Sequence, residues 1–555
     1  MIDKIKRRHF FWWLLLFLLV LPTFIGLFKS GYFPMHDDIS AMRLLEMDKC
    51  VKDGQIPCRW VPDMGFGYGY PQFNYYAPLP YYIMEVFHLG GLGYLDSVKA
   101  GFILSFVLSG VGMYLLGRTL WGRSGGFISA LFYAYLPYRA VDVFVRGAVG
   151  ELYAYAFLPF IFWACKKTLE GDKYARLVLA LSTAALLTSH NIISMIILPF
   201  LAGWIIFILI SQKLHLLPDL KKRILDLTAG FVWGFGLAAF FILPAFFERN
   251  LVHIETLTGG YFNYFAHFVS VGQLLFSTYW GYGVSEAGPW DEASFTIGLF
   301  HWLIPLLAVV IAYVLKIRRK IPLLLFWIVC GFTAAFMAHS RSAFIWKGLP
   351  LATFIQFPWR FLLLSGFFFS IGAGAIALFF PKGVRKIPYL LSLSIVLILF
   401  YAPIFTPSKW TKITDSEKFS GDSWRRQQTM SLFDYLPIDV KKGPLDAAPE
   451  NPLLVTGQGK VINWQKGTNW QKGKVRIDTK ARIELPIYFF PGWGVTVNGT
   501  AQKLTYENEL ALIMVDLEPG EYDLEARLKN TPVRLVGNII TLLGLFAIPI
   551  YLKRK

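Results

Sequence analysis

The chain has 555 residues, of which 55% are hydrophobic, 17% aromatic and only 16% charged. This composition excludes an ordinary soluble globular domain and is typical of a polytopic membrane protein. The formal net charge of +18 would suit a nucleic-acid-binding protein, but the basic residues are gathered in short loops between hydrophobic segments. That distribution favours a membrane protein with no nucleic-acid partner.

Hydropathy predicts about twelve membrane spans, each long enough to cross a hydrocarbon core of about 30 Å. The first is too long and too aromatic for a cleaved signal peptide, so we expect a retained anchor. When the spans alternate in direction, every basic loop falls on one side, and the positive-inside rule then places both termini in the cytoplasm. The predicted spans lie near residues 10–28, 98–117, 125–141, 150–165, 175–189, 192–211, 224–246, 295–315, 321–338, 358–380, 387–404 and 533–552.

All the long connections then fall on the outer side of the cell membrane. They are a first loop over residues 29–97, a second over 248–294, a shorter one over 339–357 and a hydrophilic segment over 405–532. We therefore predict an extracytoplasmic active site. We also predict three parts: a transmembrane domain over 1–404, an outer domain over 405–532, and a last span with a basic tail over 533–555.

The outer segment reads as β structure. Alternating polar and apolar residues such as those at 481–485 indicate strands. Asn498-Gly499 is a two-residue hairpin signal, and Glu518-Pro519-Gly520 predicts a second turn. We expect a domain resembling a β-sandwich.

Four cysteines are present, and two of them, Cys50 and Cys58, share the first outer loop. An oxidising compartment would permit a disulfide between them, and two free thiols remain the alternative. No group of Cys and His residues has the spacing of a metal site.

The first outer loop opens with His36-Asp37-Asp38 at the predicted membrane boundary. A carboxylate there is placed to act as a general base on a membrane-borne substrate. Two adjacent aspartates could instead hold a divalent cation such as Mg²⁺ or Mn²⁺. The structural alternative is that Asp38 caps a short interfacial helix.

Further polar residues gather on the same predicted face. An arginine suits a phosphate through charge-assisted hydrogen bonds, but also ion pairs with protein acids or anchors a span among headgroups. An acid or a histidine at a span end is often only a structural cap. The candidates for substrate binding are Arg43, Arg59 and Trp60 in the first loop, Glu151 and His190 at span ends, and Gln356 and Arg360 at the start of the tenth span.

Several of these stretches together resemble the GT-C superfamily of membrane glycosyltransferases. The similarity is strongest to the bacterial 6-pyruvoyl-tetrahydropterin synthase-related membrane proteins. It rests on the order of His36-Asp37 with Arg43, Gly54-Gln55-Ile56-Pro57 with Arg59-Trp60, residues 67–71, Arg146-Gly147 with Glu151, and residues 356–360.

The resemblance implies an inverting transferase that takes a sugar from a polyprenyl-phosphate donor in the membrane and passes it to an extracytoplasmic glycan, lipid or protein. It implies that Asp37 binds or deprotonates the acceptor and that Arg360 binds the donor phosphate. Two rival functions remain: a transporter or flippase for lipid or polysaccharide, and a non-catalytic assembly or glycan-binding protein that works through residues 405–532.

Overall fold

The computed structural model describes residues 12–287 and 291–553 and divides the chain into two compact units. The first unit comprises residues up to 38, 95–235 and 258–412, and the second comprises 39–94, 236–257 and 413–555. Each unit is therefore assembled from several stretches of sequence, and each is described by itself.

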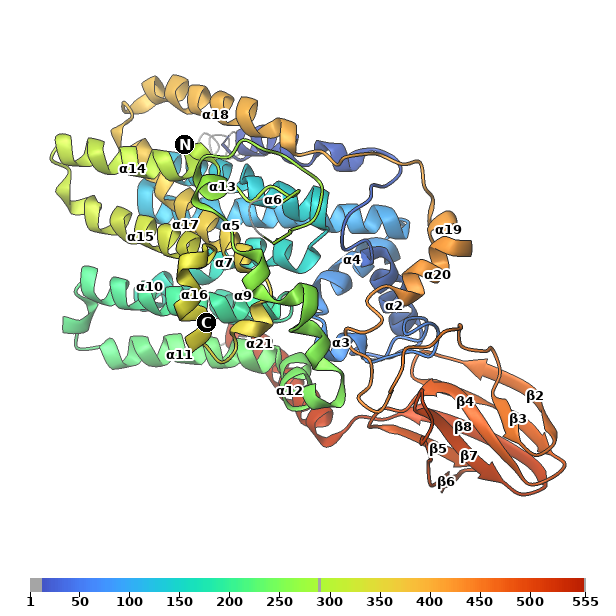
Figure 1. Cartoon of the computed structure of the whole chain (residues 1–555). Coiled ribbons are helices and arrows are strands. Elements are labelled where there is room, and N and C mark those ends of the chain that lie inside the picture. Colours follow the sequence, from blue (N-terminus) through green and yellow to red (C-terminus); the bar gives the residue numbers. More distant parts are fainter. Residues whose placement is uncertain (1–11, 288–290, 554–555) are drawn as a thin grey trace. The chain divides into compact units, whose positions relative to one another are not determined.

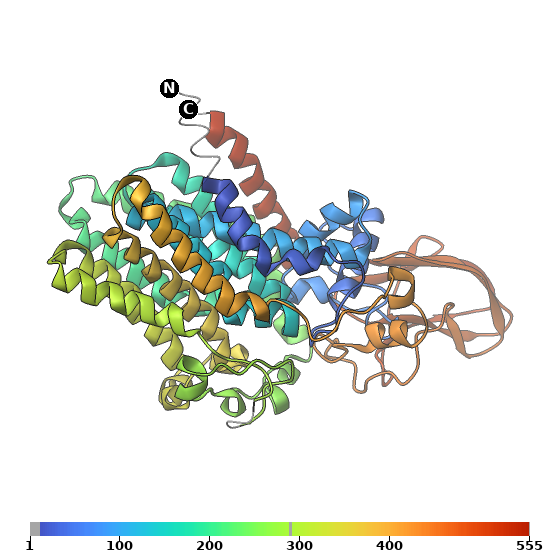
Figure 2. The same ribbon diagram turned by 90° about the horizontal axis from the view of Figure 1, so that it is seen from above.

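The first unit is a helical bundle (Figure 1). Its longest helix, α5, covers the predicted spans 98–117 and most of 125–141, and it breaks between them at Gly122, where φ is 80° and ψ is −178°. α7 packs on α8, and α17 packs on α14 and α15, which run side by side in Figures 1 and 2. The helices are α5 (Tyr94–Ala134), α6 (Pro137–Val141), α7 (Val149–Leu169), α8 (Lys173–Leu187), α9 (Asn191–Ile196), α10 (Leu198–Ser211), α11 (Leu220–Leu237), α13 (Val271–Leu275), α14 (Leu299–Val314), α15 (Ile321–Met337), α16 (Ala343–Gly348), α17 (Phe361–Ala373) and α18 (Ile387–Tyr401).

Six helices among the described residues are long and apolar enough to cross a membrane, or seven if α11 and α12 form one span. The predicted multi-pass membrane protein is thus confirmed, whereas the count of twelve stays a prediction. Two predicted spans correspond to apolar helices that are short, Trp12–Thr23 and Leu299–Val314. A third corresponds to α8, which has only 15 residues.

The second unit combines short helices with an antiparallel β domain, coloured orange to red in Figures 1 and 2. One sheet has the strand order β1-β4-β7 and the other has the order β2-β3-β8-β5-β6. The helices are α2 (Ser40–Lys52), α3 (Gln72–Tyr75), α4 (Leu79–Leu89), α12 (Ala239–Phe247), α19 (Asp415–Lys418), α20 (Gly421–Thr429) and α21 (Pro532–Lys553). The strands are β1 (Leu453–Thr456), β2 (Gly459–Lys466), β3 (Trp470–Ile477), β4 (Ala481–Tyr488), β5 (Trp493–Val497), β6 (Thr500–Gln502), β7 (Leu512–Leu517) and β8 (Gly520–Leu528).

Both predicted turns are confirmed. Asn498 and Gly499, with φ of 49° and 79°, connect β5 to β6 as a tight hairpin. The turn at Glu518 and Pro519 carries the chain from β7 in one sheet to β8 in the other. Apolar residues of both sheets share one core, and Trp60 of the first loop belongs to it. The predicted C-terminal antiparallel β domain is therefore confirmed. Its bounds, residues 405–532, stay a prediction.

The first loop contains a disulfide between Cys50 and Cys58. This resolves the alternative that the sequence left open. The N-cap of α2 is Ile39, which carries no capping side chain. Asp38 is thus not the N-cap residue that the structural alternative required.

Candidate active site

A π-helical turn in the first unit brings charged residues together. After α6 ends at Val141, residues Asp142–Arg146 form the turn, and Gly147 follows in the left-handed region with φ of 70°. The Gly147 amide donates to the Asp142 carbonyl, and α7 begins two residues later at Val149. Such turns add a residue to the helical repeat and re-aim the side chains around them, and they are frequent at functional sites.

Glu151, in the first turn of α7, is the centre of a buried ionic network. Its Oε1 accepts from Arg146 Nη2 at 2.9 Å and from Arg360 Nε at 3.2 Å. Its Oε2 accepts from the Tyr138 hydroxyl at 2.8 Å. Arg146 Nη1 also donates to Asp142 Oδ1 at 2.6 Å. Two guanidinium groups therefore face two carboxyl groups, and the partners offset the cost of burying each charge.

Arg360 reaches this network from the start of α17. Pro358 stands in the first turn of the short helix Pro358–Arg360, as its place in the sequence predicted. Arg360 Nη1 donates to the Ile355 carbonyl at 2.7 Å and to Gln356 Oε1 at 2.9 Å. Its Nη2 has no hydrogen-bond partner among residues 12–287 and 291–553 and is not fully buried. Arg360 Nη2 is therefore left as a donor for an anion.

His190 approaches Glu151 from the start of α9. Its Nδ1 accepts the Ile193 amide at 3.1 Å, which leaves Nε2 at 3.9 Å from Glu151 Oε1. Burial lowers the pKa of His190 to about 3, so the ring is neutral at physiological pH. The structure thus joins Glu151, His190, Gln356 and Arg360, which are predicted as substrate-binding residues, in one network.

His36 and Asp37 are attached to the π-turn through the backbone. The His36 amide donates to the Val145 carbonyl at 3.0 Å, and the Asp37 amide donates to the Arg146 carbonyl at 2.8 Å. Both side chains are exposed, and His36 Nε2 lies 3.0 Å from the Tyr282 carbonyl. Asp37 forms no salt bridge with any residue in the described part of the chain. The backbone of Asp37, whose carboxylate is accessible, is therefore fixed to the backbone of the arginine that also holds Glu151.

The loop between α11 and α14 contributes a second polar group of the first unit. Ser285 Oγ donates to Asp291 Oδ1 at 3.1 Å and contacts His267 Nδ1 at 2.9 Å. It also accepts from Trp359 Nε1 at 3.3 Å, and the Trp359 ring lies 4.4 Å from the Arg146 guanidinium. The serine lies between the histidine and the aspartate, so this arrangement is not a nucleophile activated by a His–Asp pair. It holds Trp359 in place.

The remaining predicted binding residues lie in the second unit and are engaged in packing. The Arg43 guanidinium is buried 3.8 Å from the centre of the Tyr76 ring. Arg59 donates to Asn74 Oδ1 at 3.0 Å and to Asn538 Oδ1 at 2.7 Å. Trp60 is 2% exposed and contacts Trp493 edge to face. Their predicted roles in substrate binding stay predictions.

Within residues 12–287 and 291–553, no group of three or more His, Cys, Asp or Glu side chains is arranged to hold a metal ion. A cation held by Asp37 and Asp38 would therefore need further oxygen ligands from substrate or water, as Mg²⁺ commonly has. The predicted divalent cation stays a prediction.

Two members of the network, Tyr138 and Asp142, were not predicted from the sequence, and Arg146 had no predicted role. One signal was available: Asp142 precedes Arg146 by four residues, a spacing that pairs opposite charges on a helix. Tyr138 had no comparable signal, because no sequence pattern distinguishes it from the other tyrosines of a chain that has 27.

Fold and site together define a multi-pass helical membrane protein with a C-terminal antiparallel β domain and a buried arginine–carboxylate network. No family model matches the chain. An uncharacterized protein of Lactococcus lactis subsp. cremoris (strain MG1363) is 24% identical over 258 residues, which are 44% of this chain and 40% of that protein. The chain thus spans less than half the length of this relative.

Two solved glycosyltransferases are similar in structure. The oligosaccharyltransferase of Archaeoglobus fulgidus, tethered to an acceptor peptide, matches 73% of this chain and 56% of its own, with 12% identity and a TM-score of 0.43. The arabinofuranosyltransferase AftD from Mycobacteria matches 74% of this chain and 28% of its own, with 12% identity and a TM-score of 0.42. Identities of 12% and TM-scores of 0.43 and 0.42 do not assign a function to this chain.

Proposed function

We propose that the protein is a GT-C-like glycosyltransferase that moves a sugar from a polyprenyl-phosphate donor in the membrane to an extracytoplasmic acceptor with inversion. The observation that carries the proposal is the backbone pairing of Asp37 with Arg146. It fixes the backbone of a residue with an exposed carboxylate to a network whose second arginine, Arg360, has no hydrogen-bond partner for Nη2 among the described residues.

The proposed reaction uses Asp37 and Arg360 in different roles. The oxygen of the acceptor hydroxyl attacks the anomeric carbon of the donor sugar, and Asp37 accepts the proton that this hydroxyl loses. The bond between that carbon and the phosphate oxygen breaks, and the electron pair leaves with the phosphate. Arg360 binds the phosphate through Nη2 and stabilises its growing charge, because a charge-assisted hydrogen bond from a guanidinium to a phosphate oxygen is strong.

The rest of the network positions these groups. Glu151 and Gln356 hold the Arg360 side chain, and Trp359 covers Arg146. Hydrogen-bond donors that are already held in position need not reorganise when charge develops in the transition state. This preorganisation typically supplies most of the rate acceleration. Arg146 is a second cation of the proposed site.

A transfer assay tests the proposal. The protein in nanodiscs is incubated with radiolabelled polyprenyl-phosphate sugars and an envelope extract that supplies acceptors. The wild type is compared with Asp37→Asn and with Asp219→Asn, in which an exposed aspartate paired with Arg223 is changed instead. We expect Asp37→Asn to lose transfer and Asp219→Asn to retain it. Full activity of Asp37→Asn would refute the role of Asp37, and the absence of turnover and donor binding in the wild type would refute the transferase.

A further inference from the structure

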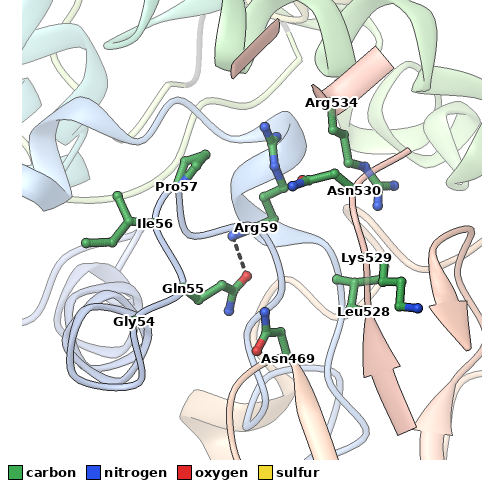
Figure 3. A pocket seen from close by; sticks show the side chains of 10 residues that line it. All are labelled: Gly54, Gln55, Ile56, Pro57, Arg59, Asn469, Leu528, Lys529, Asn530 and Arg534. Atoms are coloured by element: carbon green, nitrogen blue, oxygen red, sulfur yellow. Dashed lines mark hydrogen bonds between the residues drawn. The ribbon is translucent and has the colours of Figure 1, made fainter. Parts of the chain in front are cut away.

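A cavity in the second unit lies apart in sequence from the residues of the proposed active site. It has a volume of about 220 Å³ and is enclosed by the first loop, the start of β3 and the segment from β8 to α21 (Figure 3). Figure 3 shows the loop residues on one side of the cavity and Leu528 to Arg534 on the other. It is lined by Gly54, Gln55, Ile56, Pro57, Arg59, Asn469, Leu528, Lys529, Asn530 and Arg534.

The lining is strongly positive. Arg59, Lys529 and Arg534 each carry a positive charge, and none of the ten lining residues is acidic. The acid that compensates part of this charge is Glu248, whose Oε2 accepts from Arg534 Nε at 2.8 Å. These four groups leave two positive charges without a counter-charge among them. Burial and the neighbouring Arg534 lower the pKa of Arg59 to about 10, as expected when like charges are held close together.

Two of the three basic side chains are buried with donors to spare. Arg59 is 4% exposed and Arg534 is 0% exposed. In the part of the chain that the structure describes, Arg59 Nε and Arg534 Nη2 have no hydrogen-bond partner. A buried donor without a partner costs about 1–3 kcal/mol, and more when it is charged, so two side chains that line the cavity carry cationic donors that the described residues do not satisfy.

We propose that this cavity binds a phosphate group, with Arg59, Lys529 and Arg534 as its cationic partners and Asn469 and Asn530 as neutral donors. A phosphate carries the negative charge that the lining lacks and offers several acceptor oxygens to guanidinium groups. The cavity is smaller than the roughly 300–1,000 Å³ of sites for drug-sized ligands, so it fits a headgroup rather than a whole glycolipid.

The position of the cavity along the chain gives the phosphate two sources. Lys529 and Asn530 immediately precede α21, which begins at Pro532 and is a candidate membrane span. A lipid headgroup would therefore reach the site from the membrane, and free phosphate would reach it from solution. The proposal does not depend on the transferase activity.

The test uses the full chain in maltoside detergent, which contains no phosphate. Inorganic phosphate and dihexanoyl phosphatidate are titrated separately, and binding is measured by calorimetry and by the rise in unfolding temperature. Lys529→Gln is the main variant because its side chain is exposed. Asn530→Asp adds a negative charge at the rim, and Lys503→Gln, an exposed lysine beyond β6, is the matched control.

We expect saturable binding that Lys529→Gln weakens about tenfold, the effect of losing one charge-assisted hydrogen bond of about 1.4 kcal/mol. Asn530→Asp should abolish binding and Lys503→Gln should not change it. Tighter binding of phosphatidate than of inorganic phosphate would assign the site to a lipid headgroup, and the reverse would assign it to free phosphate. Binding of neither probe, or equal binding by all three variants and the wild type, would overturn the proposal.

Discussion

Glu151 and Arg360 are separated by 209 residues of sequence and meet in a buried ion pair, with Arg360 Nε 3.2 Å from Glu151 Oε1. The same carboxylate oxygen accepts from Arg146. One carboxylate oxygen is therefore shared by two arginines that come from different helical segments.

The first prediction follows from this sharing. Glu151→Gln should destabilise the folded protein by about 3–5 kcal/mol, because removing one partner leaves buried charge without compensation. The measurement is the free energy of unfolding in detergent. Glu170→Gln is the control, since Glu170 pairs with Lys166 and Lys167 at a partly exposed helix end, where an ion pair contributes about 0–1 kcal/mol.

The double variant Glu151→Gln with Arg360→Gln separates the ion pair from general packing. Its loss of stability should be smaller than the sum of the two single losses, because the second change removes a charge that the first left unpaired. Additive losses would show that the two side chains are not energetically coupled.

The second prediction concerns Arg360 Nη2, which has no hydrogen-bond partner within the described part of the chain. Arg360→Lys keeps the positive charge but loses this guanidinium donor. If Nη2 binds the donor phosphate, KM for the donor should rise about 10–150-fold, which corresponds to a charged hydrogen bond of about 1.5–3 kcal/mol. Arg341→Lys, at an exposed arginine, should leave KM unchanged. An unaltered KM in Arg360→Lys would assign Arg360 to structure alone.

The composition of the chain was enough to predict the class of fold. The helical spans and the antiparallel domain follow from hydropathy and from turn signals such as Asn498-Gly499, because these are local properties of the sequence. The number of spans was harder to predict, since apolar helices such as α8 and α14 are shorter than a bilayer requires by themselves.

The site could be predicted only in part. Glu151 and Arg360 were both candidates, but their meeting is a tertiary contact that no local pattern encodes. The π-turn that aims Asp142 and Arg146 was also not predictable, because its only local mark is a glycine, Gly147, in a chain with 48 glycines. Arg59 and Trp60 hydrogen-bond and pack within the second unit, contacts that the sequence does not encode locally, and Arg59 also lines the cavity there.

The third prediction tests that turn. A Cβ atom on Gly147 would overlap Met35 Sδ, and its φ of 70° is unfavourable for other residues. Gly147→Ala should therefore displace the segment that carries His36 and Asp37 and reduce both stability and transfer. Gly383→Ala is the matched control, because Gly383 has nearly the same φ, 71°, with no atom within 4 Å of the added Cβ. Met35→Ala should partly rescue Gly147→Ala, and failure to rescue would place the defect in backbone strain alone.

The last prediction concerns pH. Glu85 in α4 is 2% exposed, and its carboxyl group lies beside that of Asp48. Burial and the neighbouring Asp48 carboxylate raise the pKa of Glu85 from 4.5 to about 7. The folded protein thus binds this proton more tightly than the unfolded chain does. Stability from this group is complete below pH 4.5 and is lost as the pH rises through 7.

Glu85→Gln should remove this dependence, because an amide resembles the protonated acid and does not titrate. The unfolding temperature of the wild type should fall between pH 5 and pH 8 by several degrees more than that of the variant, as expected for a stability change of about 1 kcal/mol or more. Glu507→Gln, at an exposed glutamate of the same unit, should keep the wild-type profile. Parallel profiles for Glu85→Gln and the wild type would show that Glu85 is already ionised in the folded protein at pH 5.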